Sequence, residues 1–169
     1  MRLAKKIIVT TGLVAFFMLS GCTTPYTNKE LLDIFNAKGL DTLARDNSIV
    51  VFLPGVFFDV GKADLTQLAQ FKLGEIASVV NDPRVTERVL LLEGHTDSTG
   101  SDEDNRDLSH RRATSVYQSL IVSKVNAKRM SVRGFGEKYP IADNTKSDGS
   151  PNPEGQAKNR RVEIVVNNP

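Results

Sequence analysis

Residues Val89–Ala113 read VLLLEGHTDSTGSDEDNRDLSHRRA, and their pattern is the strongest indication of the fold in the chain. The stretch opens with Val89–Leu92, an apolar run without alternation, which is typical of a strand that is central in its sheet and covered on both faces. A polar loop follows, in which Asp102 or Asp104 can cap the next helix. The stretch therefore predicts a buried strand, a loop and a helix over about 105–122.

One side chain of that helix, Arg112, interrupts an apolar row. Residues four apart share a helix face, and the other three members of this row are apolar: Leu108, Val116 and Leu120. A guanidinium keeps its charge, and burying it without an anion is costly. Arg112 must therefore find a negative group, whereas its neighbour Arg111 is expected in solvent.

Two interpretations of Arg112 stay open. In the first, the side chain extends to solvent or pairs internally with Asp97, which follows the end of the apolar strand. In the second, both residues face an open cleft where a strand ends and helices begin, a common place for ligands in α/β sheets. A fixed negative and a fixed positive group would complement a zwitterion, because arginine presents a planar fork to a carboxylate and aspartate accepts from an ammonium group.

Outside this stretch, strand patterns and helix patterns alternate. Apolar, β-branched runs predict strands, 3.6-residue spacing predicts a helix that Asp64 can cap, and clustered Gly, Pro and Asp predict loops. The predicted elements are strands over 49–53 and 56–59, a helix over 64–80, a strand over 130–135, a loop over 138–159 and a strand over 161–166. The predicted fold class is α+β, in the order β-α-β-α-β-β, with a mixed sheet and helices packed on it.

The N-terminus has the layout of a secretory signal. Arg2, Lys5 and Lys6 precede an apolar run over 7–19, which is too short and wrongly flanked for a spanning helix. The run ends in Leu-Ser-Gly-Cys, which resembles the lipobox of bacterial lipoproteins. That resemblance implies cleavage before Cys22 and acyl chains on this residue.

The resemblance to lipoproteins also sets the predicted domain organisation. Residues 1–21 would be removed, 22–47 would form a lipidated tether with a short helix, and 48–169 would form the main domain. Thr23, in place of an aspartate after the cysteine, favours the outer membrane. Cys22 is the only cysteine, which excludes an internal disulfide.

The segment over 30–45 is only partly predictable. Thr27-Asn28-Lys29-Glu30 has the pattern of a capping box, so we expect a short helix through Phe35. Two questions stay open: whether the helix continues to Leu43, and whether it is a spacer or packs on the domain.

Composition limits the possible functions. The fractions of 40% hydrophobic and 25% charged residues fit a folded domain. Without residues 1–21 the chain carries 19 Lys and Arg against 20 Asp and Glu, so no concentrated basic face is expected. Nucleic acid is therefore not a predicted partner, and we expect no cofactor.

Four sequence blocks carry a resemblance to a known family. They are Gly94-His95-Thr96-Asp97, Asn105-x-x-Leu108-Ser109-x-x-Arg112-Ala113, Gly134-Phe135-Gly136-Glu137-x-x-Pro140 and Asn159-Arg160-Arg161-Val162-Glu163-Ile164. In this order they resemble the OmpA-like peptidoglycan-binding domain over about 51–166. That family includes outer-membrane lipoproteins of the peptidoglycan-associated type, in agreement with the lipobox.

The resemblance implies a binding protein and not an enzyme. Its ligand would be the peptidoglycan stem peptide, with Asp97 and Arg112 holding meso-diaminopimelate. By the same analogy Thr96, Asn105 and Leu108 would line or shape the site, and the backbone near Phe58 and Asp59 would contact the ligand. The protein would be lipid-anchored in the outer membrane, face the periplasm, and link that membrane to the cell wall. An acidic loop over 101–104 and an insert around 147–154 depart from the family's commonest pattern.

Two other interpretations fit parts of the sequence. Glu93, His95 and Asp97 alternate, and His110 could join them around a metal, but only two histidines are present and the spacing fits no common zinc motif. We therefore expect no metal, and we expect His95 to make structural hydrogen bonds. The second alternative is an envelope assembly, secretion or signalling lipoprotein that carries the same domain and binds an envelope protein partner.

Overall fold

The computed structural model describes residues 24–59 and 61–169. The predicted signal peptide, the lipobox and Cys22 lie outside these residues. Within the described ranges, no helix is both long enough and apolar enough to cross a membrane.

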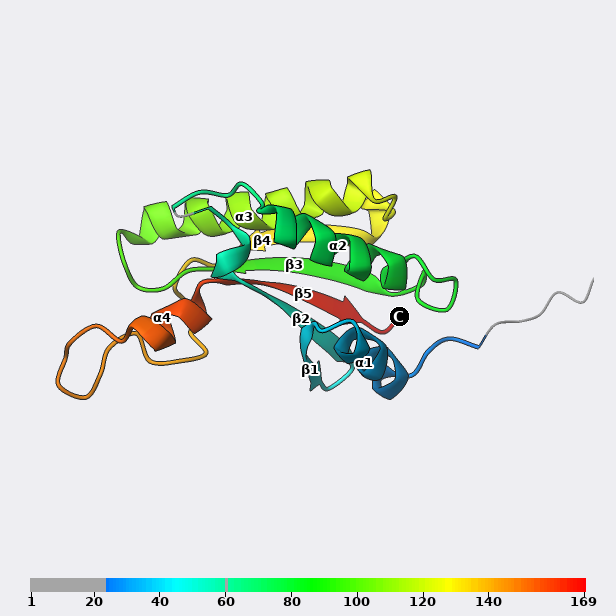
Figure 1. Cartoon of the computed structure of the whole chain (residues 1–169), viewed down its shortest axis with the longest axis horizontal. Coiled ribbons are helices and arrows are strands. Elements are labelled where there is room, and N and C mark those ends of the chain that lie inside the picture. Colours follow the sequence, from blue (N-terminus) through cyan, green and yellow to red (C-terminus); the bar gives the residue numbers. More distant parts are fainter. Residues whose placement is uncertain (1–23, 60) are drawn as a thin grey trace, which may run out of the picture.

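The domain is built on one five-stranded sheet (Figure 1). Its order is β1-β2-β5-β3-β4, in which β3 and β4 are parallel and the other neighbours are antiparallel. The strands are β1 Asp41–Arg45, β2 Ser48–Pro54, β3 Val89–His95, β4 Met130–Gly134 and β5 Arg161–Asn167. The predicted mixed sheet is therefore confirmed.

Two long helices cover one face of the sheet (Figure 1). The helices are α1 Asn28–Ala37, α2 Gln67–Val80, α3 Asp102–Val122 and the short α4 Pro153–Asn159, with 3-10 turns η1 Gly55–Phe57 and η2 Ala127–Arg129. Alternate residues of β2, including Ile49 and Val51, point into the core, where they share one cluster with Leu73 of α2 and Val116 of α3. This arrangement follows from the two-residue period of strands and the 3.6-residue period of helices.

The predicted β-α-β-α-β-β order is present within 48–169, with α4 inserted before the last strand. The loop predicted over 138–159 is wrong in its last third. Pro153 occupies the first turn of α4, and the Asn152 side chain caps it by accepting from Gly155 N at 3.2 Å. Proline has no N–H to lose at a helix start, so a residue that indicated a loop here begins a helix.

Three further predictions need correction. In place of the strand predicted over 56–59, Val56 and Phe57 belong to η1, and Phe58 forms only an isolated bridge with Leu65. Thr66 rather than Asp64 caps α2, and Ser101 rather than an aspartate caps α3. In both helices a hydroxyl accepts from the third N–H, and the acidic residues in the first turn of α3 complement the helix dipole.

The apolar strand β3 is interior but not central, because β5 occupies the middle of the sheet. It is also not covered on both faces, since Val89 is 44% exposed on the side away from the helices. The burial on both faces that the four apolar residues of β3 predicted for β3 is found in β5 instead. An uninterrupted apolar run therefore located an inner strand without fixing its place in the sheet.

The segment before β2 packs on the domain. α1 has the expected capping box between Thr27 and Glu30, and it buries Leu31 and Phe35 in the common core. The helix ends before residues 41–45, which form the edge strand β1. Of the two open possibilities for this segment, packing on the domain is correct.

Candidate ligand-binding cleft

Two glycines let α3 lie directly on the ends of β3 and β4. A Cβ atom on Gly94 would come within 2.0 Å of the Ser109 carbonyl oxygen, and one on Gly134 within 2.6 Å of the His110 amide nitrogen. The Ser109 hydroxyl accepts from the Gly136 amide at 2.9 Å, which fixes the register of the contact. The close crossing therefore positions the helix turn that carries Arg112.

Arg112 is buried, with 4% of its surface exposed. Its Nε donates to the Lys62 carbonyl at 3.0 Å, and its guanidinium lies 5.2 Å from the Phe58 ring centroid. Nη1 is buried and has no hydrogen-bond partner among the residues that the structure describes. Burial, with the nearby charge of Arg160, lowers the pKa of Arg112. Because a guanidinium stays charged in proteins, Nη1 is a cationic donor that needs an acceptor.

Asp97 does not serve as the direct counter-ion of Arg112. Its Oδ2 accepts from Nη1 of Arg160 at 2.5 Å, and its Oδ1 accepts from the Thr99 amide at 3.0 Å. Burial alone would raise the pKa of Asp97, but these donors outweigh it and hold the pKa below the usual value. Asp97 is thus ionised at neutral pH, and within residues 24–59 and 61–169 Nη1 of Arg112 keeps a donor without a partner beside it.

These groups line a cleft of about 790 Å³ between η1, α3 and α4. Its walls combine charge with apolar surface: Pro54, Gly55, Val56, Phe58, Asp59, Gly61, Asp97, Thr99, Arg112, Gln156, Ala157 and Arg160. A Cβ atom on Gly55 would lie 2.9 Å from the Arg160 carbonyl oxygen, so glycine is needed where η1 approaches α4. The cleft therefore offers two carboxylates, two guanidinium groups and an aromatic face to a ligand.

Of the seven ligand-binding residues predicted from the sequence, the cleft brings four together: Phe58, Asp59, Asp97 and Arg112. Thr96 and Asn105 are buried, Leu108 is half-buried, and none of the three lines the cleft. Asn105 donates to Glu137 at 2.8 Å, which ties α3 to the loop after β4.

Sequence reasoning did not predict that Arg160 would hold Asp97. The two residues are 63 positions apart, so no helical or strand spacing connects them. The only sequence feature that pointed to Arg160 was the arginine pair Arg160-Arg161. In the structure Arg160 lines the cleft, whereas Arg161 pairs with Glu163 on the sheet. The side chain of Gln156 was also missed, because α4 was expected to be a loop.

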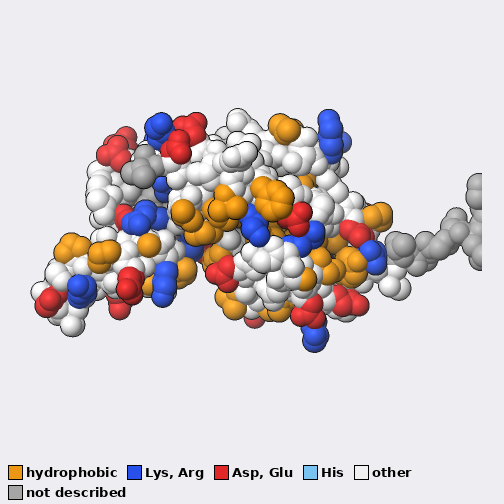
Figure 2. Space-filling model, in the orientation of Figure 1, with side chains coloured by type: hydrophobic (Ala, Val, Ile, Leu, Met, Phe, Trp, Pro, Cys, Tyr) orange, Lys and Arg blue, Asp and Glu red, His pale blue; other side chains and the backbone are white. Residues whose placement is uncertain are grey.

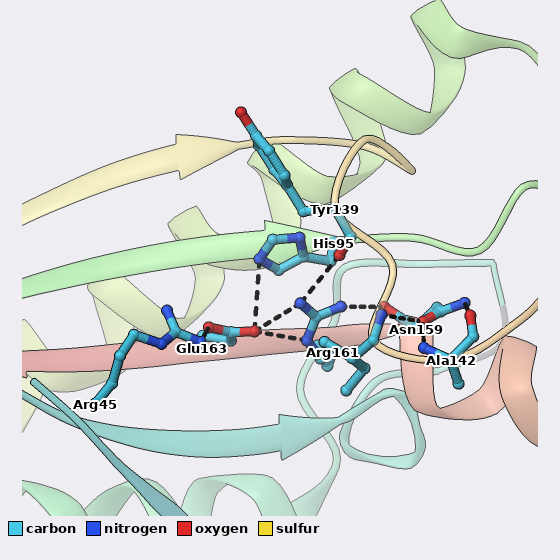
Figure 3. A network of polar contacts seen from close by, with 8 residues as sticks. Arg45, His95, Tyr139, Ala142, Asn159, Arg161 and Glu163 are labelled. Carbon is cyan, nitrogen blue, oxygen red and sulfur yellow. Dashed lines mark hydrogen bonds and ion pairs between the residues drawn. The ribbon is translucent and has the colours of Figure 1, made fainter.

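Arg161 belongs to a buried polar network on the other side of β5 (Figure 3). Its Nε donates to Oε1 of Glu163 at 2.7 Å, and Nη2 lies 2.6 Å from the same oxygen as an ion pair. Nη1 and Nη2 donate to the carbonyls of Asn159 and Tyr139, each at 3.2 Å. Nε2 of His95 lies 4.0 Å from the same Glu163 oxygen. Glu93 comes close enough to complete a group with metal-binding atom types. However, the Arg161 fork already occupies Oε1, and a cation there would face a guanidinium, so we assign no metal to this group.

The expected structural hydrogen bonds of His95 are absent. Within the described residues neither ring nitrogen has a hydrogen-bond partner, although the side chain is only 3% exposed. The ring stacks on Phe135 at a centroid distance of 5.5 Å instead. Burial and then the charge of Arg161 lower the pKa of His95 to about 4, so the ring is neutral at physiological pH.

Comparison with known proteins assigns this chain to a family. The OmpA family matches residues 57–154. A relative named probable lipoprotein YiaD, from Escherichia coli K12, is 34% identical over 139 residues, which is 81% of this chain and 59% of the relative. Across eight similar curated relatives, the chain spans 15% to 59% of their length.

Two solved structures share the fold. A cell wall anchor of the type VI secretion system from Pseudomonas aeruginosa is 26% identical, with a TM-score of 0.68, covering 87% of this chain and all of that one. The peptidoglycan-associated lipoprotein of Burkholderia pseudomallei is 25% identical, with a TM-score of 0.55, covering 65% of this chain and 86% of that one.

The fold and the cleft define a ligand-binding envelope domain, and the chain belongs to the OmpA family.

Proposed function

We propose that this protein binds the peptidoglycan stem peptide without chemical change and links the outer membrane to the cell wall. The single observation that carries the proposal is Nη1 of buried Arg112, which has no partner in the part of the chain that the structure describes and lies in a cleft where Arg160 holds Asp97 ionised. The sequence blocks that resemble the OmpA-like peptidoglycan-binding domain support it. So do the relatives described as a cell wall anchor and a peptidoglycan-associated lipoprotein.

The charges of the cleft suit the free end of meso-diaminopimelate, which is an amino-carboxylate. The ligand carboxylate would accept from Nη1 of Arg112, and the ammonium group would donate to Asp97. Phe58 supplies apolar surface for the carbon chain between them. A bond to a charged donor contributes about 1.5–3 kcal/mol, so loss of the Arg112 contact should weaken binding roughly ten- to hundredfold.

The test is sedimentation of the purified protein with peptidoglycan sacculi. Asp97→Ala and Arg112→Ala should each abolish pelleting, whereas Asp102→Ala and Arg111→Ala, matched changes of charge on exposed residues nearby, should pellet like the wild type. Circular dichroism checks that each variant folds. Wild-type pelleting by folded Asp97→Ala and Arg112→Ala variants would refute the site.

The ligand itself is tested with stem peptides. A peptide that ends in diaminopimelate should compete with sacculi, and the same peptide with lysine should not, because lysine lacks the second carboxylate. Equal competition by both peptides would contradict recognition of the amino-carboxylate end.

The membrane link rests on Cys22, which lies outside the described residues. Its lipidation is supported by the lipobox-like sequence and by the lipoprotein relatives. Cys22→Ser should release the protein from outer-membrane fractions, and continued membrane association of this variant would remove the anchor from the proposal.

A further inference from the structure

β1 forms one edge of the sheet and lies beside α1, whose Asn36 side chain accepts from the Thr42 hydroxyl. It pairs with β2 in a regular register from Asp41↔Phe52 to Arg45↔Ser48, and its other side meets no strand of the described chain. Proteins commonly block such edges with prolines, lysines, bulges or a covering element, or keep them short and charged, and β1 is short with one charge at each end. The sequence Asp-Thr-Leu-Ala-Arg contains no proline or lysine.

Two residues of β1 direct their backbone groups outward. Asp46 and Asn47 form a two-residue turn that Arg45 and Ser48 close, so the odd-numbered residues of β1 exchange hydrogen bonds with β2. Thr42 and Ala44 therefore present their N–H and C=O groups to the outer side. Among the described residues, no backbone group outside the β1–β2 ladder bonds to them.

The outward edge is complementary to itself. In an antiparallel pair of two β1 strands centred on Leu43, Thr42 lies opposite Ala44 of the other copy, and the two exchange both hydrogen bonds. Asp41 then lies opposite Arg45, and this pair occurs twice by symmetry. A shift of two residues would place Asp41 opposite Leu43 in one direction and Arg45 opposite Leu43 in the other, so opposite charges meet in only one of these registers.

The exposed surface fits this arrangement. Leu43 is 49% exposed and would be covered by its own symmetry mate. The Arg45 side chain is 47% exposed, and its contact with Glu163 is a long 3.4 Å. In Figure 2, side chains of both charges and hydrophobic side chains lie together at the lower edge, where Figure 1 places α1 and β1.

The opposite edge of the sheet lacks these features. In a pair of β4 strands centred on Val132, Ser131 would lie opposite Arg133, and no opposite charges would meet. The self-complementary pattern is therefore particular to β1.

We propose that a second copy of this chain binds at β1, so that the two sheets join into one continuous sheet across a two-fold axis. The occupant is a second copy because the charge pattern of β1 is complementary to its own reverse. This proposal does not rest on peptidoglycan binding, since none of the residues of β1 lines the cleft.

Cysteine crosslinking tests the register. In the full-length chain with Cys22→Ser, purified in detergent, Leu43→Cys places two thiols directly opposite each other across the axis. Ala44→Cys, one residue away, faces Thr42 of the other copy and lies too far from its own symmetry mate for a disulfide. After mild oxidation, Leu43→Cys should give a covalent dimer at least about fivefold more abundant than Ala44→Cys gives. Equal yields from the two variants would overturn the proposed pairing.

Charge exchange tests the partner. With the same full-length chain, Asp41→Arg should raise the dimer dissociation constant about tenfold in sedimentation experiments, because two attractive pairs become repulsive. Adding Arg45→Asp should restore dimerisation to within about twofold, since the pairs return with their signs exchanged. The proposal is wrong if the wild type stays monomeric up to about 0.1 mM, or if the folded double variant dimerises no better than Asp41→Arg. A monomeric wild type would leave the edge to a different protein.

Discussion

Acidification should destabilise the domain through His95. The ring is buried, neither nitrogen is hydrogen-bonded within the described chain, and the pKa falls from 6.5 to about 4. The charges that face it are Arg161, Glu163 and Arg45, of which only Glu163 favours the protonated ring. A proton therefore binds more tightly to the unfolded chain than to the folded one.

The sign and size follow from linkage. A group whose folded pKa is lowered contributes stability that is present above its unfolded pKa and is lost as the pH falls towards the folded pKa. For His95 the loss occurs between pH 6.5 and about 4. From about pH 7.5 to about pH 5, the free energy of unfolding should fall by about 2 kcal/mol through this residue.

Urea unfolding at the two pH values measures the effect. His95→Phe keeps an aromatic ring against Phe135 and removes the titrating group, so it should lose most of the pH dependence of the wild type. His95→Gln provides a second variant if the larger ring disturbs packing. Burial and the neighbouring Glu163 raise the pKa of Glu93, which opposes the trend, and subtracting the variant from the wild type removes this background. The reasoning is refuted if both variants keep the full wild-type slope.

Three further predictions concern stability and can be measured by thermal or urea unfolding. Gly94→Ala should cost several kcal/mol, about 3 or more, because the new methyl group would meet the Ser109 carbonyl at 2.0 Å, and no measurable loss would contradict the close crossing of α3. Arg129→Met should cost about 2–3 kcal/mol, since three carbonyls that it bonds at 2.7–2.9 Å lose their donor, whereas a neutral effect would mean that water replaces it. Thr27→Ala should cost about 1 kcal/mol by removing the capping box with Glu30, and an unchanged midpoint would show that α1 is held by packing alone.

Much of the fold was predictable because its signals are local. The apolar runs of β2 and β3 and the helical spacing of α3 each specify an element within a few residues, and the structure has all three. The errors occurred where the same residue types serve two purposes. A proline such as Pro153 can indicate a loop or occupy the first turn of a helix, and only the packing of α4 against the cleft decides between the two.

The edge strand β1 was missed for a different reason. Its five residues are mostly exposed, so they carry no alternating apolar pattern that would predict a strand. Hydrogen bonding to β2, closed by the turn at Asp46, makes them a strand. A strand of this kind forms because it hydrogen-bonds to a neighbouring strand, and the local sequence does not predict where that neighbouring strand lies.

The candidate site was predictable in its charges but not in their pairing. A helical row placed Arg112 on the buried face, and its position after the strand placed Asp97 nearby. The identity of the aspartate's partner required α4, which brings Arg160 across from the end of the chain. The pairing of Asp97 with Arg160 has a chemical consequence. If Arg112 itself paired with Asp97, the two charges would neutralise each other within the protein. With Arg160 in that role, Nη1 of Arg112 has no hydrogen-bond partner among the described residues and can serve the proposed ligand.

A second set of contacts fixes where the start of the described chain, at Tyr26 and Asn28, lies relative to the cleft. Arg88 donates to the Tyr26 carbonyl and to the Asn28 side chain, each at 2.7 Å, and Arg84 lies over the Tyr26 ring at 4.0 Å. These bonds hold the start of the described chain beside α1, at the end of the domain away from η1 and α4 (Figure 1). A force applied to the chain at this point would act along the long axis of the domain, and the cleft lies at the opposite end. For the proposed anchor this geometry is favourable, because the described chain starts at the end of the domain opposite the cleft that holds Arg112.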